Sequence, residues 1–169
     1  AIVDLTKEED EENKTCYHPQ NFDKKFKGPV SLREALAQSI NLPSVKVIYL
    51  AGIEETGKMA QKFGLSTIEG FEEHGLSLGL GTVSVKPLEM ARAYSVLATE
   101  GYLPSISGIL EVRNNQGKLL EKYTPSQEKV IDPQYPRLMN DILSDDNARS
   151  PLFGRNSLMN IPDHTTAVK

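Results

Sequence analysis

The stretch that decides the fold is Gly28-Pro29-Val30-Ser31-Leu32-Arg33-Glu34-Ala35-Leu36-Ala37-Gln38-Ser39-Ile40-Asn41-Leu42-Pro43-Ser44-Val45-Lys46. Its Ser31-Leu32-Arg33-Glu34 has the spacing of a capping box, in which the serine hydroxyl accepts a free N–H of the first helical turn and the glutamate reaches back. Pro43 disfavours helical backbone at the residue before it, so this helix should end near residues 39–41. A second helix should then begin with Pro43 at its first position. The tripeptide Ser39-Ile40-Asn41 therefore falls at a break between two helices, where polar side chains can be held rigidly and point away from the core.

The flanking sequence predicts further helices. Gly52 is a C-terminal stop for the second helix, and a third helix over residues 53–63 should end at Gly64. A long helix over residues 85–99, capped by Ser84, is apolar on most sides and is expected to be central. Between them, residues 75–81 are rich in glycine, but they lack the lysine and hydroxyl residue of a phosphate-binding loop, so a tight turn with close backbone approach is expected.

The second half of the chain predicts one β-hairpin and one more helix. Two short apolar runs, residues 109–112 and 118–123, flank a polar turn that ends in glycine, which is typical of a hairpin with a longer loop. Asp132-Pro133 has the chemistry of a cap and first turn for a helix that continues to Leu143. Residues 144–163 are expected to be a loop, and residues 165–169 the start of a β-strand. The expected fold is mainly α with one β-hairpin.

Composition limits the class of protein. The chain has 169 residues, 38% of them hydrophobic and 25% charged, which fits one ordinary globular domain. A net charge of −4 argues against a nucleic-acid partner, because such proteins need a clustered basic face. Cys16 is the only cysteine, so no internal disulfide can form. No apolar run reaches the length of a membrane span, and no signal peptide is evident.

Metal and thiol chemistry have little support in the sequence. His18, His74 and His164 are far apart and none has a ligand partner at helical or hairpin spacing. Cys16 has no basic neighbour to lower its pKa, so a nucleophilic role is not expected. The neighbouring acids Asp141, Asp145 and Asp146 lack the alternating pattern of a calcium loop and are expected to be solvated at a helix end. We expect neither metal nor cofactor.

Serine chemistry is the more informative candidate. A serine and a lysine three residues apart on a helix lie one above the other, so an unprotonated amine can take the hydroxyl proton. The literal match, Ser126-Gln127-Glu128-Lys129, lies in a polar linker with no apolar surroundings to desolvate the lysine, so we interpret it as a chance match. Ser39-Ile40-Asn41 can present a hydroxyl and an amide to the same small volume, although such a triplet alone is a weak signal.

The surroundings of that triplet resemble a known family. Residues 28–46 are similar to the region around the Ser-x-Asn motif of penicillin-binding transpeptidases, of the bifunctional (class A) type that builds bacterial peptidoglycan. Later segments resemble the same family in the same order, from about Tyr17 to the last residue. They are Leu76-Ser77-Leu78-Gly79-Leu80-Gly81, residues 87–98, residues 142–149 with Phe153-Gly154, and Thr166-Ala167-Val168-Lys169 as the approach to the Lys-Thr-Gly strand.

The resemblance implies the helical subdomain of the α+β fold shared by penicillin-binding proteins and serine β-lactamases. The corresponding division is an irregular acidic approach (1–28), a helical core (29–107), a β-hairpin (108–124), and a helix, a loop and the start of the Lys-Thr-Gly strand (132–169). It also implies acyl transfer: a serine attacks a D-Ala-D-Ala stem peptide, cross-links peptidoglycan, and is acylated by β-lactams. Ser39 would relay protons, Asn41 would orient a lysine and bind the substrate backbone, and Lys169 would attract the substrate carboxylate.

Two departures from the family pattern shape the expectation. The nucleophile motif Ser-x-x-Lys should precede the Ser-x-Asn motif, yet residues 1–38 contain no match, and no threonine and glycine follow Lys169. The chain is therefore expected to be an internal piece of a transpeptidase domain, inactive alone and prone to self-association through exposed apolar faces. Its parent is expected to be membrane-anchored and extracytoplasmic. Two alternatives stay open: a non-catalytic helical scaffold or interaction module from the same family, and a small hydrolase using Ser126 and Lys129.

Overall fold

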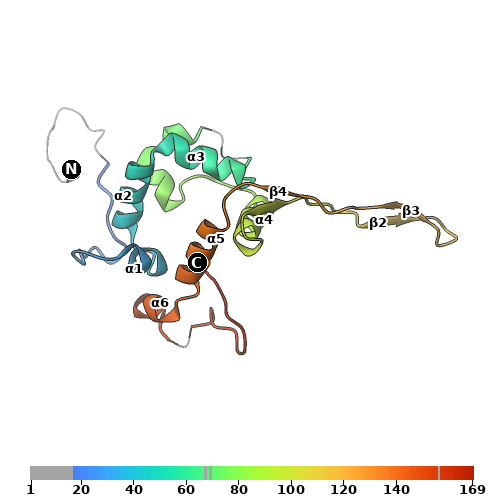
Figure 1. Cartoon of the computed structure of the whole chain (residues 1–169). Helices are drawn as coiled ribbons and strands as arrows, with labels where there is room; N and C mark the ends of the chain where they lie inside the picture. Colours follow the sequence, from blue (N-terminus) through green and yellow to red (C-terminus); the bar gives the residue numbers. More distant parts are fainter. Residues whose placement is uncertain (1–16, 67, 69, 156) are drawn as a thin grey trace.

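The computed structural model describes residues 17–66, 68, 70–155 and 157–169. Helices form one body, and a narrow two-stranded ribbon projects from it (Figure 1). The acidic run and Cys16 lie outside the described residues. Residues 17–28 form no helix or strand, as expected.

The first helix, α1, spans Leu32–Ala37 and begins at the predicted capping box. The Ser31 hydroxyl accepts the Glu34 N–H at 3.2 Å, and the Glu34 carboxylate accepts the Ser31 N–H at 3.0 Å. Two orphan N–H groups of the first turn are thereby satisfied within four residues of sequence. This prediction is confirmed.

A tight turn joins α1 to the second helix. The Ile40 N–H donates to the Ala35 carbonyl at 2.9 Å, and the Ser39 N–H donates to the Leu36 carbonyl at 3.1 Å. This bonding pattern is a Schellman motif, in which the residue at the position of Ser39 adopts left-handed backbone and is usually glycine. Ser39 has φ of +53°, so a non-glycine residue occupies a strained position at this turn.

The second helix, α2, spans Asn41–Ala51, and Pro43 is its third residue rather than its first. The predicted start was therefore two residues late. The N–H groups of a first helical turn have no intrahelical partners, so a proline is tolerated there. The Leu42 N–H is accepted by the Asn21 side chain at 3.1 Å, which supports helical backbone before the proline.

Two further segments complete this half of the body. Helix α2 ends at Gly52 with φ of +87°, and α3 spans Ile53–Lys62, both as predicted. The glycine-rich passage forms 3-10 turns, η1, over Phe71–Leu80, and both α2 and α3 pack against it. A Cβ on Gly79 would lie 2.9 Å from the Ile48 side chain. The close packing of α2 against η1 therefore favours glycine at this position.

Helix α4 spans Pro87–Ala98 and its N-cap is Lys86, so the prediction of Ser84 as the cap was wrong. The fixed φ of a proline suits the first helical position, and this places the start at Pro87. The expected central position is not observed. Ala93 and Val96 are buried, but other apolar side chains of the helix remain exposed, among them Leu88 and Tyr94.

The predicted hairpin is present as β2 (Glu111–Arg113) paired antiparallel with β3 (Leu119–Lys122), with a bulge at Val112/Arg113. The ribbon also contains a second antiparallel pair, β1 (Tyr102–Pro104) and β4 (Gln127–Lys129), which the sequence analysis missed. Strand β1 packs against α4, so the ribbon is attached to the body at its base. Its outer part extends away from the helices (Figure 1).

The C-terminal third contains one more helix than predicted. Helix α5 spans Gln134–Leu143, close to the expected bounds, but the predicted loop over residues 144–163 contains α6, Asp146–Phe153. Asp145 caps α6 by accepting the Ala148 N–H at 2.9 Å. Pro151 lies inside this helix, and the Ser150 hydroxyl donates to the Asn147 carbonyl at 3.1 Å, the carbonyl that the missing proline N–H would have reached.

The expected strand at residues 165–169 is not formed among the residues that the structure describes. A strand needs a neighbouring strand to bond its backbone. Here the Val168 N–H donates to the Leu143 carbonyl at the end of α5, at 3.1 Å. The segment therefore lies against a helix end.

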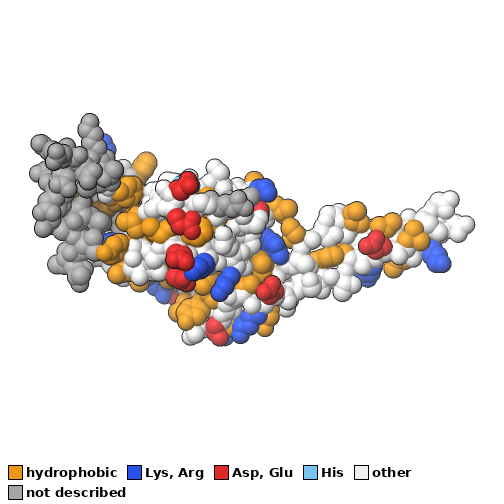
Figure 2. Space-filling view, turned by 90° about the horizontal axis from the view of Figure 1, so that it is seen from above, with side chains coloured by type: hydrophobic (Ala, Val, Ile, Leu, Met, Phe, Trp, Pro, Cys, Tyr) orange, Lys and Arg blue, Asp and Glu red, His pale blue; other side chains and the backbone are white. Residues whose placement is uncertain are grey.

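Apolar surface is abundant on the described residues. Large apolar side chains are exposed over the helical body and along the ribbon (Figure 2). The exposed fraction is 97% at Phe22 and 81% at Leu50. Self-association through such surface stays a prediction. Within the described ranges, no helix has both the length and the apolar character required to cross a membrane.

Candidate functional site

Ser39 and Asn41 line the same hollow. It has a volume of about 310 Å³ and lies between the approach segment, the α1–α2 turn and the end of α6. Ser39 is exposed and Asn41 is half-buried. The expectation that the helix break directs both polar groups into one hollow agrees with this geometry. The lining residues are Asn21, Phe22, Asp23, Lys27, Gln38, Ser39, Ile40, Asn41, Leu152 and Phe153.

The approach segment fixes Asn41. Its side-chain amide donates to the Gln20 carbonyl at 2.8 Å. The neighbouring Asn21 is buried, and its amide donates to the Lys25 carbonyl at 2.7 Å while its oxygen accepts the Leu42 N–H. The sequence analysis treated this segment as an irregular approach and missed Asn21. The sequence feature that could have indicated its role is an asparagine shortly after a proline, because asparagine side chains often hydrogen-bond nearby backbone groups.

Lys169 reaches the same turn from the other end of the chain. Its ammonium group donates to the Leu36 carbonyl at 2.7 Å, and that carbonyl also accepts the Ser39 N–H. Burial lowers the pKa of Lys169 from its ordinary value. Lys169 is not among the residues that line the hollow. The structure thus brings all three predicted site residues to the end of α1, but only Ser39 and Asn41 share the cavity.

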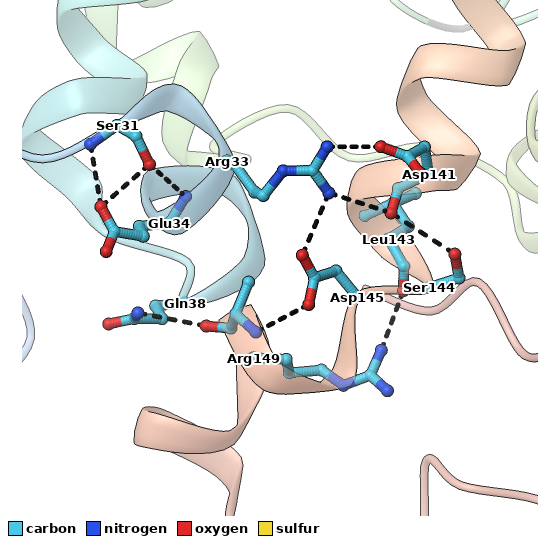
Figure 3. A network of polar contacts seen from close by, with 10 residues as sticks. Ser31, Arg33, Glu34, Gln38, Asp141, Leu143, Ser144, Asp145 and Arg149 are labelled. Atoms are coloured by element: carbon cyan, nitrogen blue, oxygen red, sulfur yellow. Dashed lines mark hydrogen bonds and ion pairs between the residues drawn. The ribbon is translucent and has the colours of Figure 1, made fainter.

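A polar network joins α1 to α5 and α6 (Figure 3). The Arg33 guanidinium pairs with the Asp141 carboxylate and, at 3.1 Å, with that of Asp145. Gln38 donates to the Ala148 carbonyl at 3.1 Å. The expectation that the acids are merely solvated at a helix end was wrong, because Asp141 and Asp145 hold Arg33. Arg33 thus holds the first turn of α1 to α5, and Gln38, the residue before Ser39, holds the end of α1 to α6.

Asp145 connects this network to the start of α6. The bond from the Ala148 N–H lowers the pKa of Asp145 most, and the Arg33 guanidinium lowers it further. The pKa of Asp145 is lower in the folded chain than its ordinary value, so the carboxylate stabilises the fold fully when the pH is above the ordinary pKa. This contribution is lost as the pH falls through the lowered pKa.

Amide exchange at Ala148 can test this pH dependence. We expect the Ala148 N–H to exchange progressively faster, relative to a central α5 amide, below about pH 4. Asp145→Asn keeps a capping oxygen and removes the acid, so its Ala148 exchange should not show that additional acid dependence. Equal acid dependence in both proteins would contradict the role of Asp145.

The Ser126-x-x-Lys129 match has the wrong geometry for a nucleophile and base. Lys129 is on strand β4, and residues three apart along an extended chain point to opposite faces. The Lys129 ammonium lies 4.0 Å from the Asp132 carboxylate. The hydrolase alternative therefore loses its structural basis.

Among the described residues, no group of three or more histidine, cysteine, aspartate and glutamate side chains could hold a metal ion. This covers the three histidines; Cys16 lies outside the described residues.

Comparison with known proteins decides the family. Residues 3–158 match the family model of the penicillin-binding protein transpeptidase domain. The chain belongs to this family. Related sequences include penicillin-binding protein 1A of Aquifex aeolicus, 35% identical over 125 residues, which cover 74% of this chain and 17% of that protein. Another is penicillin-binding protein 2a of Streptococcus pneumoniae, 32% identical over 114 residues, 68% of this chain and 16% of that protein.

Solved structures of transpeptidases show the same arrangement. Penicillin-binding protein 1A from Haemophilus influenzae has a TM-score of 0.70 and 27% identity, covering 76% of this chain and 23% of that one. Penicillin-binding protein A of Mycobacterium tuberculosis, solved as an imipenem acyl-enzyme complex, has a TM-score of 0.76 at 19% identity, covering 92% of this chain and 39% of that one. The predicted fold, the helical part of a penicillin-binding transpeptidase, is confirmed. The chain spans less than a fifth of the length of the curated relatives named above.

Proposed function

We propose that this chain supplies the Ser-x-Asn part of the active site of a serine D-Ala-D-Ala transpeptidase that cross-links peptidoglycan stem peptides and is acylated by β-lactams. The observation that carries the proposal is the convergence of Ser39, Asn41 and Lys169 on the end of α1. Ser39 and Asn41 face one hollow, and Lys169 shares the Leu36 carbonyl with the Ser39 backbone.

The proposed reaction is acyl transfer through a serine that is not part of this chain. The serine oxygen bonds to the carbonyl carbon of the penultimate D-Ala, and its proton passes to a base. The peptide bond then breaks, and the terminal D-Ala leaves as an amine after accepting a proton. The amine of a neighbouring stem peptide attacks the resulting ester, forms the cross-link and releases the serine.

Each of the three residues has chemistry suited to one step. A hydroxyl both donates and accepts, so Ser39 can relay the proton toward the leaving amine. The Asn41 amide is held by Gln20 and offers a carboxamide for orienting a lysine and the substrate backbone. The Lys169 ammonium bonds the Leu36 carbonyl through one of its three N–H groups, and the others can attract the carboxylate of a stem peptide or a β-lactam.

The first test is covalent labelling of the purified chain with a fluorescent penicillin. We expect no label, because the proposed nucleophile lies outside the chain. A label at Ser126, abolished by Ser126→Ala, would overturn the proposed division of the active site.

A second test uses a longer protein that contains this chain within a complete transpeptidase domain. Asn41→Ala should slow acylation by a fluorescent penicillin about tenfold, as expected for loss of one orienting hydrogen bond. The matched control is Asn147→Ala, an exposed asparagine on α6, which should keep the parental rate. An unchanged rate in Asn41→Ala would contradict the role of Asn41, and a complete domain that never acylates would favour the scaffold alternative.

Location and partners follow from the same proposal. Peptidoglycan stem peptides and β-lactams are the expected partners of the complete domain, at the extracytoplasmic face of a bacterial membrane. The exposed apolar side chains of the helical body are surfaces that the rest of such a domain can cover.

A further inference from the structure

Arg149 is the most buried charged side chain among the described residues, with 3% of its surface exposed. One guanidinium nitrogen donates to the Leu143 carbonyl at 2.9 Å. A second nitrogen donates to the Asp146 carboxylate and to the Asn160 side-chain oxygen, each at 3.1 Å. Arg149 therefore ties three places together: the end of α5, the start of α6 and the loop that follows α6.

The segment that carries Lys169 is anchored at two of these places. The Val168 N–H donates to the Leu143 carbonyl at 3.1 Å, the same oxygen that Arg149 binds. The Thr166 hydroxyl donates to the Met159 carbonyl at 2.7 Å, next to Asn160 in the loop that Arg149 also holds. Arg149 therefore bonds both places at which this segment is anchored, the Leu143 carbonyl and the loop that contains Met159.

Lys169 in turn lies at the end of α1. Its ammonium bonds the Leu36 carbonyl, which also accepts the Ser39 N–H. Hydrogen bonds thus connect Arg149 and Val168 to the same Leu143 carbonyl, and Lys169, the next residue in the chain, bonds the Leu36 carbonyl at the Ser39 turn. A charged donor bonds a carbonyl more strongly than a neutral one does, and a buried bond is not exchanged for water.

We propose that Arg149 is a positioning residue, which holds the segment bearing Lys169 against α5 and so places the Lys169 ammonium beside Ser39. Arg149 touches no candidate site residue itself. The position of the Lys169 ammonium beside Ser39 is independent of the proposed function. The inference that this position affects acylation rests on the proposed function.

The placement is tested first, in the full chain, by NMR. Arg149→Met removes all three hydrogen bonds, and Arg149→Lys keeps a positive charge beside Asp146 but loses the fork that reaches Leu143 and Asn160 together. In both variants we expect the Val168 amide to exchange about tenfold faster and the pKa of Lys169 to rise toward its ordinary value. If Arg149→Met does not fold, as judged by circular dichroism, Arg149→Lys carries the test.

The control is Asp145→Ala, which weakens the α6 cap without touching either bond to the Leu143 carbonyl. It should leave Val168 exchange and the Lys169 pKa unchanged. Unchanged values in the folded Arg149 variant, or equal changes in the control, would overturn the positioning role.

The acylation rate separates this inference from the proposed function. In a longer protein with a complete transpeptidase domain, Arg149→Lys should acylate about tenfold more slowly, in line with the loss of one well-placed charge. If Val168 and Lys169 are released but acylation is unchanged, positioning by Arg149 stands and the catalytic role proposed for Lys169 fails. If neither Val168 nor Lys169 responds, the positioning role fails whatever the acylation rate.

Discussion

Replacing Ser39 with alanine or with glycine should lower the acylation rate about a hundredfold in a protein with the complete transpeptidase domain. Both substitutions remove the hydroxyl that we propose as the proton relay, and a positioned acid or base contributes about 10² to 10⁴ in rate. The rate is measured as the second-order labelling constant for a fluorescent penicillin. Ser126→Ala is the matched control, because Ser126 is an exposed serine on the ribbon, away from the hollow.

The two Ser39 variants separate catalysis from backbone strain. Ser39 has φ of +53° at the glycine position of the Schellman turn, so alanine keeps the strain and glycine relieves it. We therefore expect Ser39→Gly to be more stable than Ser39→Ala by about 1 kcal/mol in urea unfolding of the chain. If Ser39→Gly acylated at the parental rate while Ser39→Ala did not, the residue would act through the turn and not through its hydroxyl.

Gly101→Ala should destabilise the chain by about 2 to 5 kcal/mol. Gly101 has φ of +98°, and a Cβ there would lie 2.4 Å from the Ile131 backbone oxygen, which cannot move aside as a side chain can. The same glycine accepts the Val130 N–H at 2.9 Å and donates to the Val96 carbonyl at 2.8 Å, so it joins α4 to the end of the ribbon. The magnitude adds about 1 to 2 kcal/mol of left-handed backbone strain to about 1 to 3 kcal/mol of overpacking.

Gly117→Ala is the control for Gly101→Ala. Gly117 has φ of +79°, but a Cβ there would meet nothing within 4 Å. Its substitution therefore reports the backbone strain alone, about 1 to 2 kcal/mol. The unfolding free energies of both variants come from urea titrations followed by circular dichroism. Equal losses in the two variants would show that the contact with Ile131 is relieved at no cost.

The parts of the fold that were predicted correctly depend on neighbours in sequence. The Ser31–Glu34 capping box, the stop at Gly52 and the hairpin turn between β2 and β3 are each made within a few residues. Backbone restrictions and side-chain capping act at that range, so the residue pattern reports them directly. The family resemblance was carried by the same local segments.

The wrong predictions share a different cause. Residues 144–163 contain Pro151 and Gly154, which usually interrupt helices, yet α6 forms because Asp145 caps it and Ser150 replaces the missing donor. Helix α2 begins at Asn41 because Asn21, which is 21 residues from Leu42, accepts its N–H. In both places a side-chain contact outweighs the intrinsic preference of a proline.

For the candidate site, the sequence by itself determined that the helix beginning at the Ser31–Glu34 capping box ends near Ser39 and Asn41, which therefore share one turn because they are neighbours in sequence. The break itself is made by the Schellman bonds at Ser39 and not by Pro43, because Leu42 before the proline is helical. Only the tertiary structure decided that Lys169, 133 residues from Leu36, reaches that turn. It alone also decided that Arg149 and the Val168 N–H bond the same Leu143 carbonyl. Such contacts join residues remote in sequence, and their free energy comes from burial and hydrogen bonding that exist only once the helices have packed.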